Sequence, residues 1–135
     1  METTVSPRRN SSAYAMPGVV RRPPKPEEID KVVARHYGLN VEDLSVKTRK
    51  REIVEPRQIA MYMNELYTKE SLKDIGRRYG KDHATVLHAS KTVINLKETD
   101  RHFSAIVETI VEKLASAYVL KVFNRAQGLT ENAKS

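Results

Sequence analysis

The chain contains no cysteine and no tryptophan, and only two phenylalanines in 135 residues. Without cysteine it can form neither a disulfide framework nor a thiolate metal site. No run of apolar residues is long enough to span a bilayer, and the N-terminus lacks the apolar region of a signal peptide. These absences exclude a disulfide-stapled scaffold and a transmembrane helix, and they are compatible with the cytoplasm.

Acidic residues are in short supply. The chain has 24 lysines and arginines against 17 aspartates and glutamates, which gives a net charge of +7. This balance favours an anionic partner, either nucleic acid or an acidic membrane surface. The positive charge is also concentrated, because residues 47–91 hold eleven basic and six acidic side chains whereas residues 27–46 hold two and five.

The length and the helical patterning predict one all-α domain, a small helical bundle. Residues 1–26 read as a disordered basic tail, because the Pro- and Arg-rich segment 21–26 cannot form a helix interior. Phosphate contacts by this tail and a plain solvated linker both remain open. Residues 27–126 are expected to form the helical domain, followed by a frayed C-terminus over 127–135.

The segment 71–91, SLKDIGRRYGKDHATVLHASK, organises the rest of the chain. It reads as two short helices joined by a tight turn, within a helix-turn-helix that extends over about 71–97. Ser71 and Asp82 are expected to cap the two helices, and Gly80 is expected to end the first in a left-handed conformation. Apolar positions predict the buried faces of the two helices: Leu72, Ile75 and Tyr79 in the first, and Val86, Ala89 or Ser90, Val93 and Leu96 in the second.

Three further helical segments are predicted from caps and spacing. The first runs from about Glu27 to Tyr37 and stops at Gly38, with one more helical turn over 41–44. The next begins with Pro56 at its first position. The last is capped by Asp100 and runs to about Arg125. The inward faces of these helices are predicted to be Ile29, Val32, Val33 and Tyr37; Ile59, Met63, Leu66 and Tyr67; and Ile106, Ile110, Leu114 and Ala117.

Two basic segments are candidates for contact with nucleic acid. The first is the loop 47–51, in which an exposed arginine could enter a minor groove, although a solvated charged loop is the plainer interpretation. The second is the start of the helix at Pro56, where Arg57 and Gln58 could approach a phosphate. A surface ion pair with a nearby glutamate is the alternative for Arg57.

Four motifs occur together and in order: VARHY (33–37), RKREIVEPRQIAM (49–61), SLKDIG (71–76) and DHATVLHA (82–89). Together they resemble the C-terminal DNA-binding domain, domain IV, of the bacterial chromosomal replication initiator DnaA. The resemblance covers roughly residues 27–116. It implies a Trp-repressor-like helix-turn-helix bundle that reads an asymmetric duplex element, the DnaA box.

The resemblance also implies roles for single residues. Arg49 corresponds to an arginine that enters the minor groove, with Arg51 in the same basic segment. Arg57 and Gln58 correspond to a phosphate-contacting pair, and Lys81 replaces an arginine that contacts the backbone. The residues that meet bases and adjoining phosphates would be Asp82, His83, Ala84 and Thr85. Two departures stand out: Ala84 occupies a position where many members have threonine, and the turn is one residue shorter than the usual two-glycine turn.

Nothing in the sequence predicts catalysis. The chain has no Walker A motif, and the near miss over 76–82 lies inside the helix-turn-helix. His83 and His88 are five residues apart, unlike the i, i+4 pair of a zinc helix. We therefore expect no enzyme activity, no cofactor and no metal. Without an ATPase domain, the sequence is either a free-standing relative of the DNA-binding module or a fragment, and the Pro- and Arg-rich tail favours the first alternative.

The predicted partner is duplex DNA, with no membrane role and a cytoplasmic, nucleoid-associated location. The function suggested is binding of a DnaA-box-like element in replication initiation or its regulation. A transcriptional regulator and a non-specific basic DNA-binding or protein-interaction module remain alternatives. The long last helix could mediate self-association or bind a protein partner, or it could fold back on the first helix.

Overall fold

The structure is a computed structural model that describes residues 23–116. Within this range the chain forms α-helices and one short 3-10 helix and no strand, so the predicted all-α class is confirmed. The elements are α2 (Pro26–His36), η1 (Val41–Ser45), α3 (Arg51–Tyr67), α4 (Leu72–Arg78), α5 (His83–Thr99) and α6 (Arg101–Ala115).

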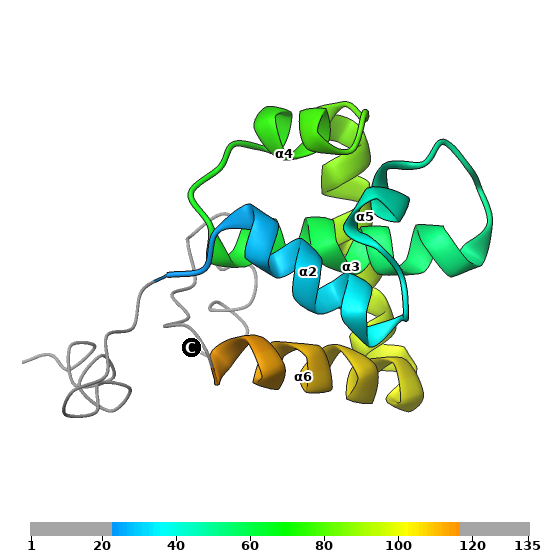
Figure 1. The fold of residues 1–135 in the computed structure, drawn as a ribbon. Helices are drawn as coiled ribbons and strands as arrows, with labels where there is room; N and C mark the ends of the chain where they lie inside the picture. The colour runs from blue at the N-terminus through cyan, green and yellow to red at the C-terminus, as the bar shows by residue number, and fades with distance from the viewer. Residues whose placement is uncertain (1–22, 117–135) are drawn as a thin grey trace, which may run out of the picture.

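Helix α3 lies at the centre of the bundle. Figure 1 shows α4 above it and α6 below it, with α2 running between these two layers. Helix α3 packs against α2, η1, α4 and α5, and every one of its residues from Ile59 to Tyr67 is buried. A helix that is buried all round is typical of the middle of a bundle. The remaining helices are therefore positioned relative to α3.

The predicted first helix is confirmed to within one residue at each end. Pro26 opens α2, where its missing amide hydrogen is not needed, and the Lys25 amide donates to Glu28 Oε1 over 2.8 Å. Ile29 and Val33 are fully buried. Gly38 follows the helix with a φ of +71°, in the left-handed region that glycine adopts without strain.

The predicted start of α3 is wrong. The helix begins at Arg51, so Pro56 lies inside it and Arg51 belongs to the helix, not to the basic loop. Proline removes one backbone hydrogen bond, to the carbonyl of Glu52, four residues earlier. Because Glu52 is an exposed residue in the first turn, water can take the place of the missing donor. The loop between η1 and α3 is therefore 46–50.

The buried stripe of α6 agrees with the predicted one at Ile110 and Leu114 and differs from it elsewhere. It consists of Phe103, Val107, Ile110 and Leu114, whereas the predicted Ile106 is only partly buried. The helix packs against both α2 and α5, and this pair of neighbours selects the stripe. The predicted Asp100 cap is confirmed, since its Oδ1 accepts a hydrogen bond from the Phe103 amide over 3.1 Å.

Packing of α6 against α2 confirms the fold-back alternative for residues 101–115. The predicted continuation of this helix to Arg125, the frayed end and most of the basic tail lie outside the described residues. Self-association through the last helix therefore stays a prediction. None of the helices in residues 23–116 combines the length and apolar character that a membrane span requires.

Candidate nucleic-acid interface

The helix-turn-helix has the caps and the turn that the sequence predicts. Ser71 Oγ accepts from the Asp74 amide over 3.0 Å at the start of α4, and Asp82 caps α5. Between the two helices Gly80 has a φ of +70°, which ends α4 without strain. The Lys81 amide then donates to the Gly76 carbonyl over 2.8 Å, which closes the turn.

The turn is tight because Gly76 has no side chain. A Cβ built at this position would lie 2.5 Å from the carbonyl oxygen of Lys81 and 3.0 Å from that of Asp82. Since the neighbouring atoms are backbone, a larger residue could be accommodated only by moving the start of α5. Gly76 therefore fixes how closely α4 approaches the first turn of α5.

The start of α5 is exposed while its opposite side is buried. His83, Ala84 and Thr85 are exposed in the first turn. The face that turns toward α3 and α4 carries the buried residues Val86, Ala89, Ser90 and Val93. Both alternatives for the inner face, Ala89 and Ser90, are therefore buried. Ser90 is accommodated because its hydroxyl donates to the buried carboxylate of Glu65 on α3.

Asp82 and Thr85 form a local polar unit at this helix start. Asp82 Oδ1 accepts from the Thr85 amide over 2.9 Å and from the Thr85 hydroxyl over 2.8 Å. These two bonds, the amide first, lower the pKa of Asp82 from its usual range. The carboxylate is therefore charged near neutral pH, and Thr85 is the one other residue among 23–116 that donates hydrogen bonds to it.

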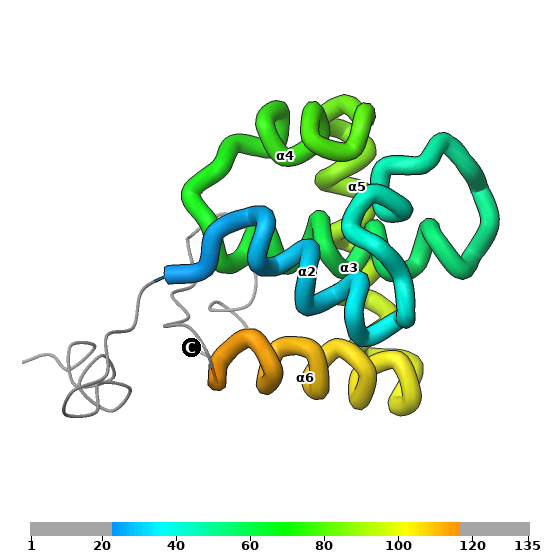
Figure 2. The backbone as a smooth tube through the Cα atoms, in the orientation of Figure 1, coloured from blue at the N-terminus to red at the C-terminus, as the bar shows by residue number. Residues whose placement is uncertain are grey.

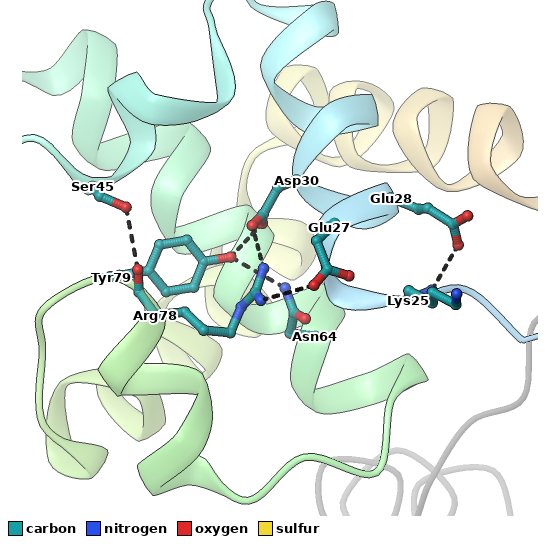
Figure 3. A network of polar contacts seen from close by, with 8 residues as sticks. All are labelled: Lys25, Glu27, Glu28, Asp30, Ser45, Asn64, Arg78 and Tyr79. Carbon is teal, nitrogen blue, oxygen red and sulfur yellow. Dashed lines mark hydrogen bonds and ion pairs between the residues drawn. The ribbon is translucent and has the colours of Figure 1, made fainter.

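A buried polar network holds the end of α4 against α2 (Figure 3). The Arg78 guanidinium pairs with Asp30 over 2.6 Å and with Glu27 over 3.8 Å, and the Tyr79 hydroxyl donates to the other oxygen of Asp30. Asn64 of α3 donates to the Tyr79 hydroxyl over 3.2 Å. Three helices thus meet at the two residues that precede the turn.

Burial of this network shifts the pKa values of Asp30 and Tyr79. Burial raises the pKa of Asp30 above its usual range, although the Tyr79 hydroxyl and the Arg78 guanidinium both act to lower it. Burial, followed by the charge of Asp30, raises the pKa of Tyr79 well above its usual value. The phenol therefore keeps its proton and serves as a hydrogen-bond donor.

The basic loop lies apart from the helix-turn-helix and projects from one side of the domain (Figure 2). Arg49 is exposed and has no hydrogen bond or ion pair within the described range. Arg51 is also exposed and pairs with Glu55 over 3.3 Å along α3. The loop is connected to the helix-turn-helix through η1, where the Ser45 hydroxyl donates to the Arg78 carbonyl over 3.2 Å.

Arg57 differs from the surface residue that the sequence suggested. Only 5% of its surface is exposed, and its guanidinium donates to the carbonyl oxygens of Leu44, Val46 and Thr48. The alternative of a surface ion pair with a glutamate is therefore wrong. Its contact with a phosphate stays a prediction, as does that of Gln58, which is half-buried one position further along α3.

Three exposed residues of α5 were missed from the sequence. Leu87, His88 and Lys91 continue the face that begins with His83 and Ala84. The i, i+4 spacing of a helix could have identified them, because positions 87 and 88 lie one turn beyond positions 83 and 84. Leu87 stands out, since 38% of this large apolar side chain is exposed.

No group of three or more metal-ligating side chains occurs within residues 23–116. The exposed side chains at the start of α5 and in the loop offer hydrogen bonds, apolar contacts and charge. Lys81, Asp82, His83, Ala84 and Thr85 are brought together at the start of α5, whereas Arg49 and Arg51 lie on and beside the separate loop.

Comparison with known proteins identifies this arrangement. A family model described as the bacterial DnaA protein helix-turn-helix matches residues 26–93, from the start of α2 into α5. The chain is 48% identical over 97 residues to the chromosomal replication initiator protein DnaA of Flavobacterium psychrophilum, covering 71% of this chain and 20% of that protein. The corresponding protein of Bacteroides thetaiotaomicron is also 48% identical over 97 residues, covering 69% and 21%.

A third relative, the DnaA protein of Brucella abortus, is 45% identical over 85 residues, with 62% of this chain and 17% of that protein covered. The chain thus spans about a fifth of the length of these relatives. The family relation supports DNA binding and a relation to replication initiators. The chain belongs to the bacterial DnaA helix-turn-helix family.

Proposed function

We propose that this domain binds duplex DNA sequence-specifically, at a DnaA-box-like element, with α5 in the major groove. The observation that carries the proposal is the exposure of His83, Ala84 and Thr85 at the start of a helix whose other side is buried. Helix-turn-helix proteins read base edges with residues at this position. The family relation supports the same assignment.

The exposed groups suit the edges of bases in the major groove. His83 can donate to a guanine or thymine acceptor, and the second carboxylate oxygen of Asp82 can accept from a cytosine amine. The methyl group of Ala84 can contact a thymine methyl group. Thr85 already donates its hydroxyl to Asp82, so it has a methyl group and acceptor lone pairs left for DNA.

The basic residues supply a second set of contacts. We assign Arg49, with Arg51 beside it, to the adjoining minor groove, where an A/T-rich tract has a narrow groove and a strongly negative potential. Lys81 and Gln58 are assigned to phosphates, which fix the register of the protein on the duplex but carry no sequence information. Sequence reading thus rests on α5 and the exposed arginines.

The biological role follows from the relatives. They are named as chromosomal replication initiators, and we propose that this domain acts at an origin or in the regulation of initiation. It acts there by binding and not by catalysis, and it would be found with the nucleoid in the cytoplasm. We propose that the partner of this domain is duplex DNA and that the domain has no role at a membrane.

Fluorescence anisotropy tests the proposal with two duplexes of equal length and composition, one carrying a DnaA box and one a scrambled box. We expect a preference of about tenfold or more for the box, equivalent to about 1.4 kcal/mol. The titrations are repeated at low and near-physiological salt, because phosphate contacts alone weaken steeply with salt. Specific reading is expected to keep its preference at the higher salt.

His83→Ala provides the residue-level test, with His102→Ala on the exposed side of α6 as the matched control. Loss of a base contact is expected to cost about 1–3 kcal/mol on the box duplex and much less on the scrambled one. The control is expected to bind both duplexes like the unmodified protein. Equal losses on the two duplexes, or no box preference in the unmodified protein, would overturn the proposal.

A further inference from the structure

Arg57 occupies an unusual position for a cation in a basic DNA-binding domain. Its guanidinium lies beneath the segment that leads from η1 into the basic loop, and it is almost completely buried. The Nη1 group donates to the carbonyls of Leu44 over 3.4 Å and Val46 over 2.9 Å, and the Nη2 group donates to that of Thr48 over 3.2 Å.

The three acceptors alternate along the chain. Residues 44, 46 and 48 present their carbonyls to one planar group, which only arginine can offer, because lysine has a single rotatable ammonium group. The Lys50 amide in turn donates to the Thr48 hydroxyl over 3.2 Å. The segment is thus bonded up to the residue immediately before Arg49, whose own side chain has no hydrogen bond or ion pair with any of residues 23–116.

The charge of Arg57 has no carboxylate partner among residues 23–116. Burial lowers the pKa of Arg57, yet an arginine remains protonated at any physiological pH. Because a buried cation bound only to neutral carbonyls pays a desolvation cost, its presence calls for a compensating role. Holding the shape of the loop is the role that its bonds indicate.

We infer that Arg57 is a positioning residue, which fixes residues 44–48 so that Arg49 is presented to the minor groove. It acts through the backbone of the loop and does not itself bind a phosphate. This inference rests on the proposed function, and it replaces the phosphate role that the family resemblance implies for Arg57. The function of Arg49 as the reading side chain is unchanged.

A double-mutant cycle with Arg49→Ala and Arg57→Lys tests the inference by anisotropy on a box duplex with an A/T-rich flank. Lysine keeps the charge for a phosphate but cannot bridge three carbonyls. We expect each single variant to lose about tenfold in affinity, and the double variant to lose less than about twofold more. Independent losses that multiply, or an Arg57→Lys variant with normal affinity, would overturn the inference.

Arg35→Lys is the matched control, since Arg35 is exposed on α2 and no contact with DNA is assigned to it. It is expected to leave the affinity within about twofold of the unmodified protein. A box duplex with a G/C-rich flank is measured in parallel, because loss of positioning affects the minor-groove contact and a lost phosphate contact affects both flanks equally.

Limited trypsin digestion of the DNA-free protein separates this inference from the proposed function. The segment 47–51 contains four trypsin sites, and release of its backbone in Arg57→Lys is expected to speed cleavage there severalfold. Unchanged cleavage would show that Arg57 does not hold the loop backbone, and it would overturn the inference. Faster cleavage together with no box preference in the unmodified protein overturns the proposed function instead.

If Arg57→Lys does not fold, NMR of the unmodified protein can distinguish between a positioning role and a phosphate contact for Arg57. The Nη protons of Arg57 are expected to exchange slowly with water, and to keep their chemical shifts when a box duplex is added. A large shift of these protons on DNA binding would indicate a phosphate contact and contradict the inference.

Discussion

The turn between α4 and α5 and the loop between η1 and α3 are held by different means. The turn is fixed by opposite charges and a phenol that join α2, α3 and α4, with Arg78 and Asp30 at the centre. The loop is fixed by the guanidinium of Arg57, bound to neutral carbonyls. Several elements support the proposed major-groove reader, whereas one side chain supports the proposed minor-groove arm.

This difference suits the two kinds of reading. Base edges in the major groove require donors and acceptors in fixed positions, and a helix anchored through its turn provides them. A minor groove is read through its width and potential, so an exposed arginine on a loop is sufficient. Changes in the turn should therefore affect both folding and recognition, whereas changes in the loop should affect recognition alone.

The largest effect is expected for Arg78→Ala. Removal of this guanidinium leaves the buried Asp30 carboxylate without its opposite charge, and loss of one partner from such a pair costs about 3 kcal/mol. Urea unfolding followed by circular dichroism measures the loss. Arg77→Ala is the control, because Arg77 is exposed and pairs only with Asp74, and it should change the stability by less than about 0.5 kcal/mol. Equal losses in the two variants would show that the network does not hold the turn.

A smaller effect is expected for Gly76→Ala. The added methyl group would meet the Lys81 carbonyl at 2.5 Å, and such overpacking costs about 1–3 kcal/mol, offset by about 1 kcal/mol of helix propensity. We expect a net loss of about 1 kcal/mol, together with weaker binding to a box duplex because the start of α5 moves.

Gly38→Ala is the control for this strain. Gly38 has a positive φ, unlike Gly76, but no other atom of residues 23–116 lies within 4 Å of its would-be Cβ, and it is outside the helix-turn-helix. Its replacement should cost about 1 kcal/mol in stability and leave the box affinity unchanged. A Gly76→Ala variant that binds the box normally would show that the close approach of α4 to the start of α5 is not needed for DNA binding.

A still smaller effect is expected from the pH dependence of Asp82→Ala. Since the pKa of Asp82 is lowered in the folded state, its contribution is fully present above the unfolded value of about 3.9 and is lost as pH falls through the folded value. The difference in Tm between the unmodified protein and the variant should therefore disappear on the acid side. A difference that stays constant down to pH 2 would exclude a role of the charged carboxylate in the cap.

The smallest effect on stability is expected for Arg49→Ala. Because this side chain is exposed and unbonded within residues 23–116, the free energy of unfolding should stay within about 0.5 kcal/mol of the original value. Binding to a duplex with an A/T-rich flank should nevertheless weaken. Arg35→Ala, exposed on α2, serves as the control and should alter neither quantity. A marked loss of stability would mean that the loop is held by Arg49 as well as by Arg57.

Local features of the fold could be predicted from the sequence. The caps at Ser71, Asp82 and Asp100 and the left-handed Gly80 depend on residues a few positions apart, and all were confirmed. The start of α3 could not be predicted in this way. Pro56 is a strong local indicator of a helix start, but the preceding exposed turn tolerates the missing hydrogen bond.

Contacts between residues far apart in the sequence could not be predicted from local sequence patterns. Asp30 and Tyr79 are 49 residues apart, and no spacing rule connects a carboxylate on α2 with a phenol at the end of α4. The sequence predicted a surface position for Arg57 because arginine is usually exposed. The loop carbonyls that accept its hydrogen bonds come within reach only when η1 packs against α3. The α5 face beyond Thr85 could have been read from helical spacing alone.

Backbone NMR during titration with a DnaA-box duplex tests whether α5 is the helix that reads the DNA. We expect the largest shifts at 81–85, 87, 88 and 91 and in the loop 46–50, with little change along the exposed side of α6. A scrambled duplex should give smaller shifts that are lost at near-physiological salt. The same shifts with both duplexes, or the largest shifts along α6, would contradict the assignment of α5 as the reading helix.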